Sequence, residues 1–112
     1  MSSNPLKPDV GAATLFAALG DPTRLGLVAR LSDGAPRSIG ALAADTSLTR
    51  QAVTKHLRVL EGAGLVAASR AGRESRYAFR AEGLVRARSF LDTVSAQWDD
   101  AIHRLRLHVE GD

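Results

Sequence analysis

The C-terminal third of the chain repeats an apolar residue at alternating intervals of three and four positions, and this spacing restricts the possible folds most. The residues that follow it are Leu84, Ala87, Leu91, Val94, Trp98, Ala101 and Leu105. Because a helix brings such positions to one side, the spacing predicts one long helix with a heptad seam. Phe90, Ile102 and Val109 widen the seam, so the helix presents more apolar surface than a chain of 112 residues easily covers.

This excess apolar surface predicts a partner helix. A second copy of the chain is the simplest source, since symmetric dimers are the commonest oligomers. The alternative is a helix that packs only on the core of its own chain. The candidate dimerisation residues are Leu84, Leu91, Val94, Trp98 and Leu105.

Length and composition favour a single domain with one modest core. Residues 1–10, with Pro5 and Pro8 and no apolar periodicity, are expected to form a flexible arm, and residues 11–112 the domain itself. No long uncharged apolar run and no signal-peptide pattern is present, so we expect a cytoplasmic protein without a membrane span. The absence of cysteine excludes disulfide scaffolds, thiolate metal sites and cysteine nucleophiles.

Two helices are predicted in the first part of the domain. The first covers residues 11–19 and stops at Gly20. The second begins at Asp21-Pro22, because an Asp side chain accepts from free amides and proline suits the first helical position. Its predicted buried face comprises Leu25, Val28 and Leu31.

A helix-turn-helix is predicted next. Ser38 caps a very short helix that ends near Asp45, and its buried face is formed by Ile39, Leu42 and Ala43. After a tight turn, Thr49 caps a longer helix that Gly62 and Gly64 close. Two helices about four residues apart, the first too short to stand alone, are typical of this motif.

Residues 65–80 change to the alternating pattern of strands. The runs 65–69 and 76–80 enclose a basic, glycine-containing tip, and Tyr77 and Phe79 alternate with Arg76 and Arg80. The fold class is therefore mainly α with a small β-hairpin, which is a winged helix-turn-helix.

Positive charge is concentrated in this part of the chain. Residues 47–80 carry seven basic and two acidic residues, a net charge of +5, whereas the whole chain has a net charge of +3. Such a block is typical either of a site for a polyanion or of a solvated basic face.

The helix after Thr49 separates into two faces. Val53, Leu57 and Leu60 lie on one side, and the opposite side carries Gln51, Thr54, Lys55 and Arg58. Those polar side chains suit the major groove of double-stranded DNA. We expect base contacts from Arg50, Gln51, Thr54 and Lys55 and phosphate contacts from Arg58 and from the hairpin residues Arg70, Arg73 and Arg76. Thr49 completes the candidate site, and His56 is expected to be a half-buried packing residue.

Three segments together resemble the ArsR/SmtB family of winged-helix repressors. They are LGDPTRLGLVARL, TRQAVTKHLRVLEGAGLV and RAGRESRYAF, which are similar to the second helix, the recognition helix and the hairpin wing of that family. The resemblance covers roughly residues 12–80. It implies a homodimer of order α-α-α-α-β-β-α that dimerises through its first and last helices and represses transcription from a palindromic operator. It also implies DNA contacts at Arg50, Gln51, Thr54 and Lys55.

The chain departs from the metal-sensing members of that family. Their cysteine pair is missing from residues 37–42, and the Asp-x-His pair of the last helix is also missing. Asp99 and His103 share a helix face, but His108 is turned away from them. We therefore expect no cofactor and no metal site, with Asp99 and His103 as the weaker alternative.

Two other classes of function fit the sequence less well. A winged-helix protein-interaction module would be expected to replace the polar face of the recognition helix, which is intact here. Enzyme motifs such as G-x-S-x-G and H-E-x-x-H are absent. Three modes of control are compatible with the sequence: an unidentified small-molecule effector, a partner protein, and control by protein level alone.

Overall fold

The computed structural model describes residues 10–111. In chain order, its elements are α1 (Val10–Leu19), α2 (Pro22–Leu31), β1 (Arg37–Ser38), α3 (Ile39–Ala44), α4 (Arg50–Gly62), β2 (Val66–Ala71), β3 (Glu74–Phe79) and α5 (Ala81–Glu110). The predicted winged helix-turn-helix is confirmed, with one short strand, β1, added. The arm predicted at residues 1–10 lies outside the described residues except for Val10, which begins α1.

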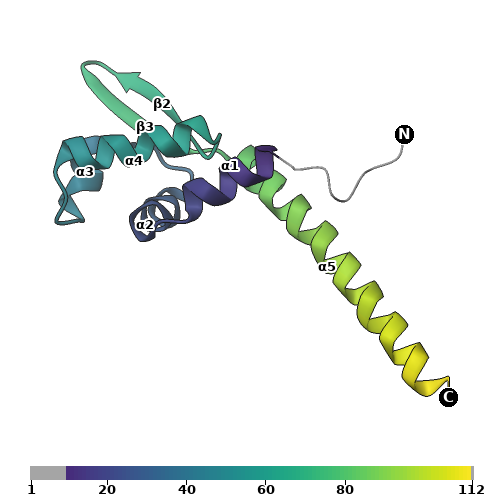
Figure 1. The fold of residues 1–112 in the computed structure, drawn as a ribbon. Coiled ribbons are helices and arrows are strands. Elements are labelled where there is room, and N and C mark those ends of the chain that lie inside the picture. Colours follow the sequence, from purple (N-terminus) through teal and green to yellow (C-terminus); the bar gives the residue numbers. More distant parts are fainter. Residues whose placement is uncertain (1–9, 112) are drawn as a thin grey trace.

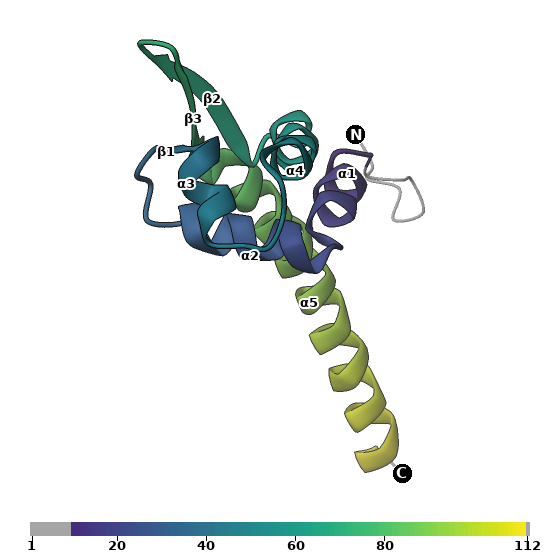
Figure 2. The same ribbon diagram turned by 90° about the vertical axis from the view of Figure 1, so that its left-hand side faces the viewer.

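The molecule is elongated, with principal extents of 69 × 32 × 21 Å. Helix α5 leaves the body formed by α1–α4 as a long rod, and the hairpin of β2 and β3, called the wing below, projects from the other side (Figure 1). Turning the molecule by 90° shows the wing standing beyond α3 and α4, far from the free end of α5 (Figure 2). Within residues 10–111, no helix combines the length and apolarity needed to cross a membrane.

Three helices begin at the caps predicted from the sequence. Asp21, Ser38 and Thr49 each accept a hydrogen bond from the backbone N–H three residues later, at 3.0, 3.0 and 3.1 Å. Each cap satisfies a backbone donor that the first turn of a helix leaves unpaired. These contacts fix the starting points of α2, α3 and α4.

The end of α4 is also defined by its sequence. The N–H of Leu65 donates to the carbonyl of Leu60, and the N–H of Gly64 donates to that of Glu61, both at 3.0 Å. Gly64 has a φ of +80°, a conformation that favours glycine. This pair of bonds is a Schellman motif, which ends the helix and turns the chain directly into β2.

A core of aliphatic side chains joins the helices to the sheet. Leu15 of α1, Leu42 of α3 and Leu57 of α4 are among its fully buried members. The predicted face of α2 is partly wrong, because Leu25 is 52% exposed whereas Leu27 is buried. Leucines at 25 and 27 fit a helical stripe with Val28 and Leu31 about equally well, and tertiary packing selects Leu27.

The sheet has three antiparallel strands in the order β1-β3-β2. Strand β1 was not predicted, because two residues are too few to show an alternating pattern; it pairs Arg37 with Tyr77. The wing strands also run closer to the tip than predicted, so the turn contains only Gly72 and Arg73. Gly72 has a φ of +64°, which suits the first position of a two-residue hairpin turn.

Within residues 10–111, the other elements cover mainly the first part of α5. Ala87 is buried, and the ring of Phe90 meets that of Phe16 of α1 edge-on at 5.7 Å. Every residue from 88 to 100 is exposed, and Trp98 reaches 65% exposure. The excess apolar surface predicted from the heptad spacing is therefore present on this helix.

Burial of Leu60 should stabilise the whole domain. We expect Leu60→Ala to lower the free energy of unfolding by about 2–5 kcal/mol, because it leaves a cavity between α4 and its neighbours. Val59→Ala on the same helix is the matched control, since Val59 is exposed and its loss should change stability by no more than about 0.5 kcal/mol. Urea unfolding at one protein concentration measures both, and equal effects would contradict the assigned core face.

Candidate nucleic-acid interface

The exposed side of α4 lines a groove of about 1180 Å³. The N-terminal part of α3 and the tip of the wing line its other sides. All six residues predicted from α4 and its cap line this groove: Thr49, Arg50, Gln51, Thr54, Lys55 and Arg58. Arg73 joins them from the wing, so the structure brings these seven side chains onto one concave surface.

The rotation of α4 about its axis decides which side chains reach the groove. Val53, Leu57 and Leu60 are fully buried. Gln51 and Lys55 are exposed on the opposite side. The two-faced helix predicted from the sequence is confirmed.

The threonine hydroxyls of this surface are already engaged. Thr49 Oγ1 accepts from the N–H of Ala52 as the helix cap. Thr54 Oγ1 donates to the carbonyl of Arg50 at 2.7 Å, one turn earlier. Thr54 therefore offers mainly its methyl group for new contacts, whereas Gln51 and Lys55 offer polar groups.

The guanidinium of Arg50 lies against α3. A Cβ placed on Gly40 would come within 3.0 Å of a terminal nitrogen of Arg50, so a glycine at this position lets the side chain lie close to the backbone of α3. Sequence reasoning missed this contact. The available signal was a glycine inside a six-residue helix, where it costs about 0.5–1 kcal/mol relative to alanine and therefore suggests a packing role.

The three wing arginines do not act as one cluster. Arg73 lies in the turn and lines the groove. Strand register places Arg70 opposite Ser75 and Arg76 opposite Ser69, which puts Arg70 and Arg76 on different faces of the hairpin. Arg76 also forms an ion pair with Glu74, with Nε 3.1 Å from Oε2.

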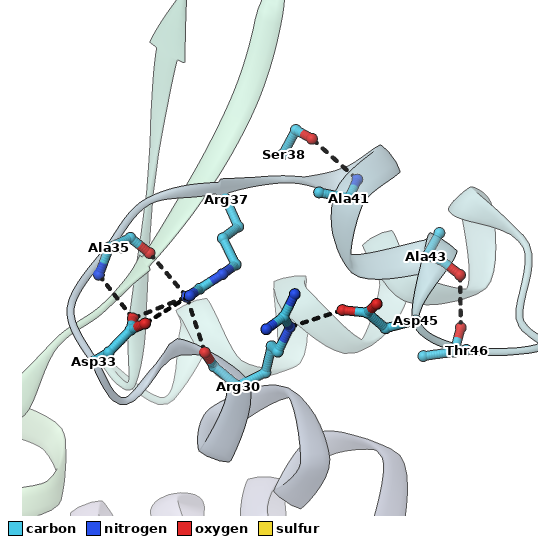
Figure 3. Close-up of polar contacts among 9 residues, drawn as sticks. All are labelled: Arg30, Asp33, Ala35, Arg37, Ser38, Ala41, Ala43, Asp45 and Thr46. Carbon is cyan, nitrogen blue, oxygen red and sulfur yellow. Dashed lines mark hydrogen bonds and ion pairs between the residues drawn. The ribbon is translucent and has the colours of Figure 1, made fainter.

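Helix α3 is held in place by ionic contacts at both ends (Figure 3). Before its start, the guanidinium of Arg37 donates to both carboxylate oxygens of Asp33, at 2.6 and 2.9 Å, and to the carbonyl of Arg30. At its end, Arg30 Nε lies 2.7 Å from Asp45 Oδ2. These contacts tie α3 to the C-terminal end of α2.

The Asp33 carboxylate is strongly favoured in its ionised form. The Arg37 side chain and, to a lesser degree, the N–H of Ala35 hold the pKa of Asp33 well below its usual range. The loop between α2 and β1 is therefore fastened by a charged pair at neutral pH.

The residues considered for metal binding lie elsewhere, on α5. Asp99 and His103 are both exposed and one helical turn apart. Among residues 10–111, no group of three or more His, Asp or Glu side chains is arranged to hold a metal ion.

Comparison with known proteins assigns the chain to a family. A family model described as a helix-turn-helix domain matches residues 19–67. An ArsR-like transcriptional regulator from Rhodococcus sp. RHA1 has a similar structure, with a TM-score of 0.76 and 35% identity over 87% of this chain and 91% of that chain. The chain belongs to the ArsR/SmtB family of helix-turn-helix transcriptional regulators.

Two curated relatives extend the comparison with this family. The chain is 47% identical over 75 residues to the HTH-type transcriptional regulator CmtR of Mycobacterium tuberculosis, a match that covers 67% of this chain and 63% of CmtR. It is 33% identical over 91 residues to the HTH-type transcriptional repressor SmtB of the same organism, covering 81% of this chain and 65% of SmtB. The match thus spans less than two thirds of either relative. This ArsR/SmtB sequence contains no cysteine and so offers no thiolate ligand.

The Asp33–Arg37 pair predicts how stability depends on pH. Because the pKa of Asp33 is lowered in the folded protein, its contribution is fully present above about pH 4, the ordinary carboxyl value, and is lost on further acidification. We expect Asp33→Asn to lower the unfolding temperature at neutral pH and to lose that difference as the pH falls below 4. Asp99→Asn on exposed α5 is the control, and a pH-independent difference for Asp33→Asn would contradict the assignment.

Proposed function

We propose that this protein is a homodimeric, sequence-specific transcriptional regulator that represses by occupying a palindromic operator in double-stranded DNA. The observation that carries the proposal is the groove, in which the polar side of α4 and the tip of the wing face the same concave surface. Family membership supports it, since SmtB is named as a transcriptional repressor.

Within this proposal, α4 is the helix that enters the major groove. Arg50, Gln51 and Lys55 lie in its first two turns, and recognition helices direct this end toward the base edges. Arginine and lysine can address guanine, glutamine can address adenine, and the methyl group of Thr54 can meet that of thymine. Arg58 lies further along the helix and is assigned to a phosphate.

The wing is assigned to the DNA backbone. Arg73 extends the groove surface and is the foremost candidate for a phosphate contact. Arg70 and Arg76 remain candidates through their positive charge. The ion pair with Glu74 must open, however, before Arg76 can contact a phosphate directly.

Dimerisation is proposed through α5 and α1. Leu84, Leu91, Val94, Trp98 and Leu105 are all exposed and follow the heptad seam. A second copy would bury them, since soluble proteins seldom leave such a long apolar stripe in water. Two copies of α4 would then meet successive major grooves about 34 Å apart.

Regulation is proposed to be independent of thiolate metal binding, because the sequence has no cysteine. The candidate modes of control are an organic effector, a partner protein and the level of the protein alone. The protein is proposed to act in the cytoplasm, where its DNA target lies.

Binding to the DNA upstream of the protein's own gene tests the proposal. We expect sequence-selective binding with two chains per operator, and log K falling linearly with log salt concentration by about 0.9 per phosphate contacted. Footprinting and fluorescence anisotropy at several salt concentrations supply both measurements. If no DNA is bound selectively even at about 50 mM salt, where phosphate contacts are strong, the protein-interaction module becomes the better hypothesis.

Residues assigned to bases and residues assigned to phosphates should respond differently to substitution. We expect Lys55→Ala to lose about 1–3 kcal/mol of discrimination at one base pair, whereas Arg73→Ala should weaken all sequences about equally and make the salt slope shallower by about 1. A panel of single-base operator variants, measured with each protein, separates the two. A uniform loss in both proteins would reject the division of roles between α4 and the wing.

A further inference from the structure

One side chain of α2 joins the end of α1 to the recognition helix. Arg24 Nε donates to the carbonyl of Ala18 at 2.6 Å, and Nη2 donates to that of Ala17 at 3.3 Å. The carbonyls in the last turn of a helix have no N–H donor from a following turn. Arg24 supplies donors to two of them and therefore acts as a side-chain cap for α1. Its guanidinium is thereby fixed at the junction of α1 and α2.

The same guanidinium reaches α4. Arg24 Nη1 lies 3.3 Å from Nδ1 of His56, which follows the groove residue Lys55 and precedes the core residue Leu57. An arginine side chain has only donors, so this hydrogen bond requires an unprotonated Nδ1 and therefore a neutral imidazole. The contact between α1, Arg24 and α4 exists in only one protonation state of His56.

A second partner is available for the other state. Asp21 Oδ2 lies 3.8 Å from the same Nδ1 of His56. The N–H of Arg24 lowers the pKa of Asp21, so this carboxylate stays ionised. Asp21 and Arg24 are the charged side chains placed against His56, and the carbonyls that α1 contributes, those of Ala17 and Ala18, accept from Arg24.

Protonation would exchange these partners. The imidazolium Nδ1 then carries a proton, so it faces an arginine donor of the same charge sign and cannot accept from it. It can donate instead to Asp21, which belongs to the cap of α2. His56 would then bind Asp21, the N-cap of α2, in place of the Arg24 guanidinium that is bonded to α1.

We propose that His56 is a positioning residue that holds the recognition helix in register with α1 only while its imidazole is neutral, so that discrimination between operator and other DNA weakens as the pH falls. This inference rests on the proposed function, because α1 is assigned to the dimer and α4 to the bases. Small displacements of α4 relative to the dimer would misplace base contacts but leave most phosphate contacts possible.

The test is the ratio of affinities for operator and for random DNA between about pH 5.5 and 8, the range in which histidines titrate. The ratio is the appropriate readout, because an added positive charge strengthens phosphate contacts to both DNAs about equally. For the unmodified protein, we expect the ratio to fall by about three- to tenfold from the upper to the lower pH, as for the loss of one hydrogen bond.

Two variants isolate His56. In His56→Asn, the amide oxygen can take the place of Nδ1 and accept from Arg24 at every pH, and His56→Gln is a second neutral acceptor should the first fold poorly. Both should keep the ratio constant with pH. His103→Asn on exposed α5 is the matched control and should show the same fall as the unmodified protein. Thermal unfolding at each pH verifies that every protein is folded.

The outcomes separate this inference from the proposed function. A pH-independent ratio in the unmodified protein, or an equal fall in both His56 variants, overturns the role of His56 while operator binding stands. No discrimination between the two DNAs even at pH 8 overturns the proposed function itself.

Discussion

Burial of one face of α4 is the interaction on which the rest of the structure depends. Val53, Leu57 and Leu60 are completely removed from water by side chains of the neighbouring helices and of the sheet. Each such burial is worth about 1.5–3 kcal/mol, whereas an ordinary hydrogen bond such as that of Thr54 contributes about 0.5–1.5 kcal/mol. The apolar face therefore sets the rotation of α4, and the exposed polar face follows from that rotation.

Helix α5 is built directly onto the end of α4. A Cβ on Gly83 would lie 2.5 Å from the carbonyl oxygen of Gly64, so the first turn of α5 rests on the backbone of the turn that closes α4. The N–H of Arg80 also donates to the carbonyl of Leu65 at 2.8 Å. Because few atoms lie between the two helices at this point, the direction of α5 and the position of α4 are fixed together.

The parts of this fold that depend on neighbours in the sequence could be predicted from it. Caps at Asp21, Ser38 and Thr49 and the long stripe of α5 follow from interactions three or four residues apart. Other features depend on contacts that the sequence does not reveal. Strand β1 exists because Arg37 meets Tyr77 forty residues later, and Leu27 rather than Leu25 is buried because of the helices around it.

Prediction of the candidate site divides in the same way. The exposed residues of α4 follow from helical periodicity. The contact of Arg50 with Gly40, by contrast, requires the angle between α3 and α4, and the Arg24–His56 contact joins residues 32 positions apart.

The basic residues of the groove depend on these tertiary contacts as well. Of the seven basic residues in the block, only Arg50, Lys55, Arg58 and Arg73 line it, together with Glu74. The others do not line the groove, so they contribute to the positive potential of the surface rather than to the shape of the site.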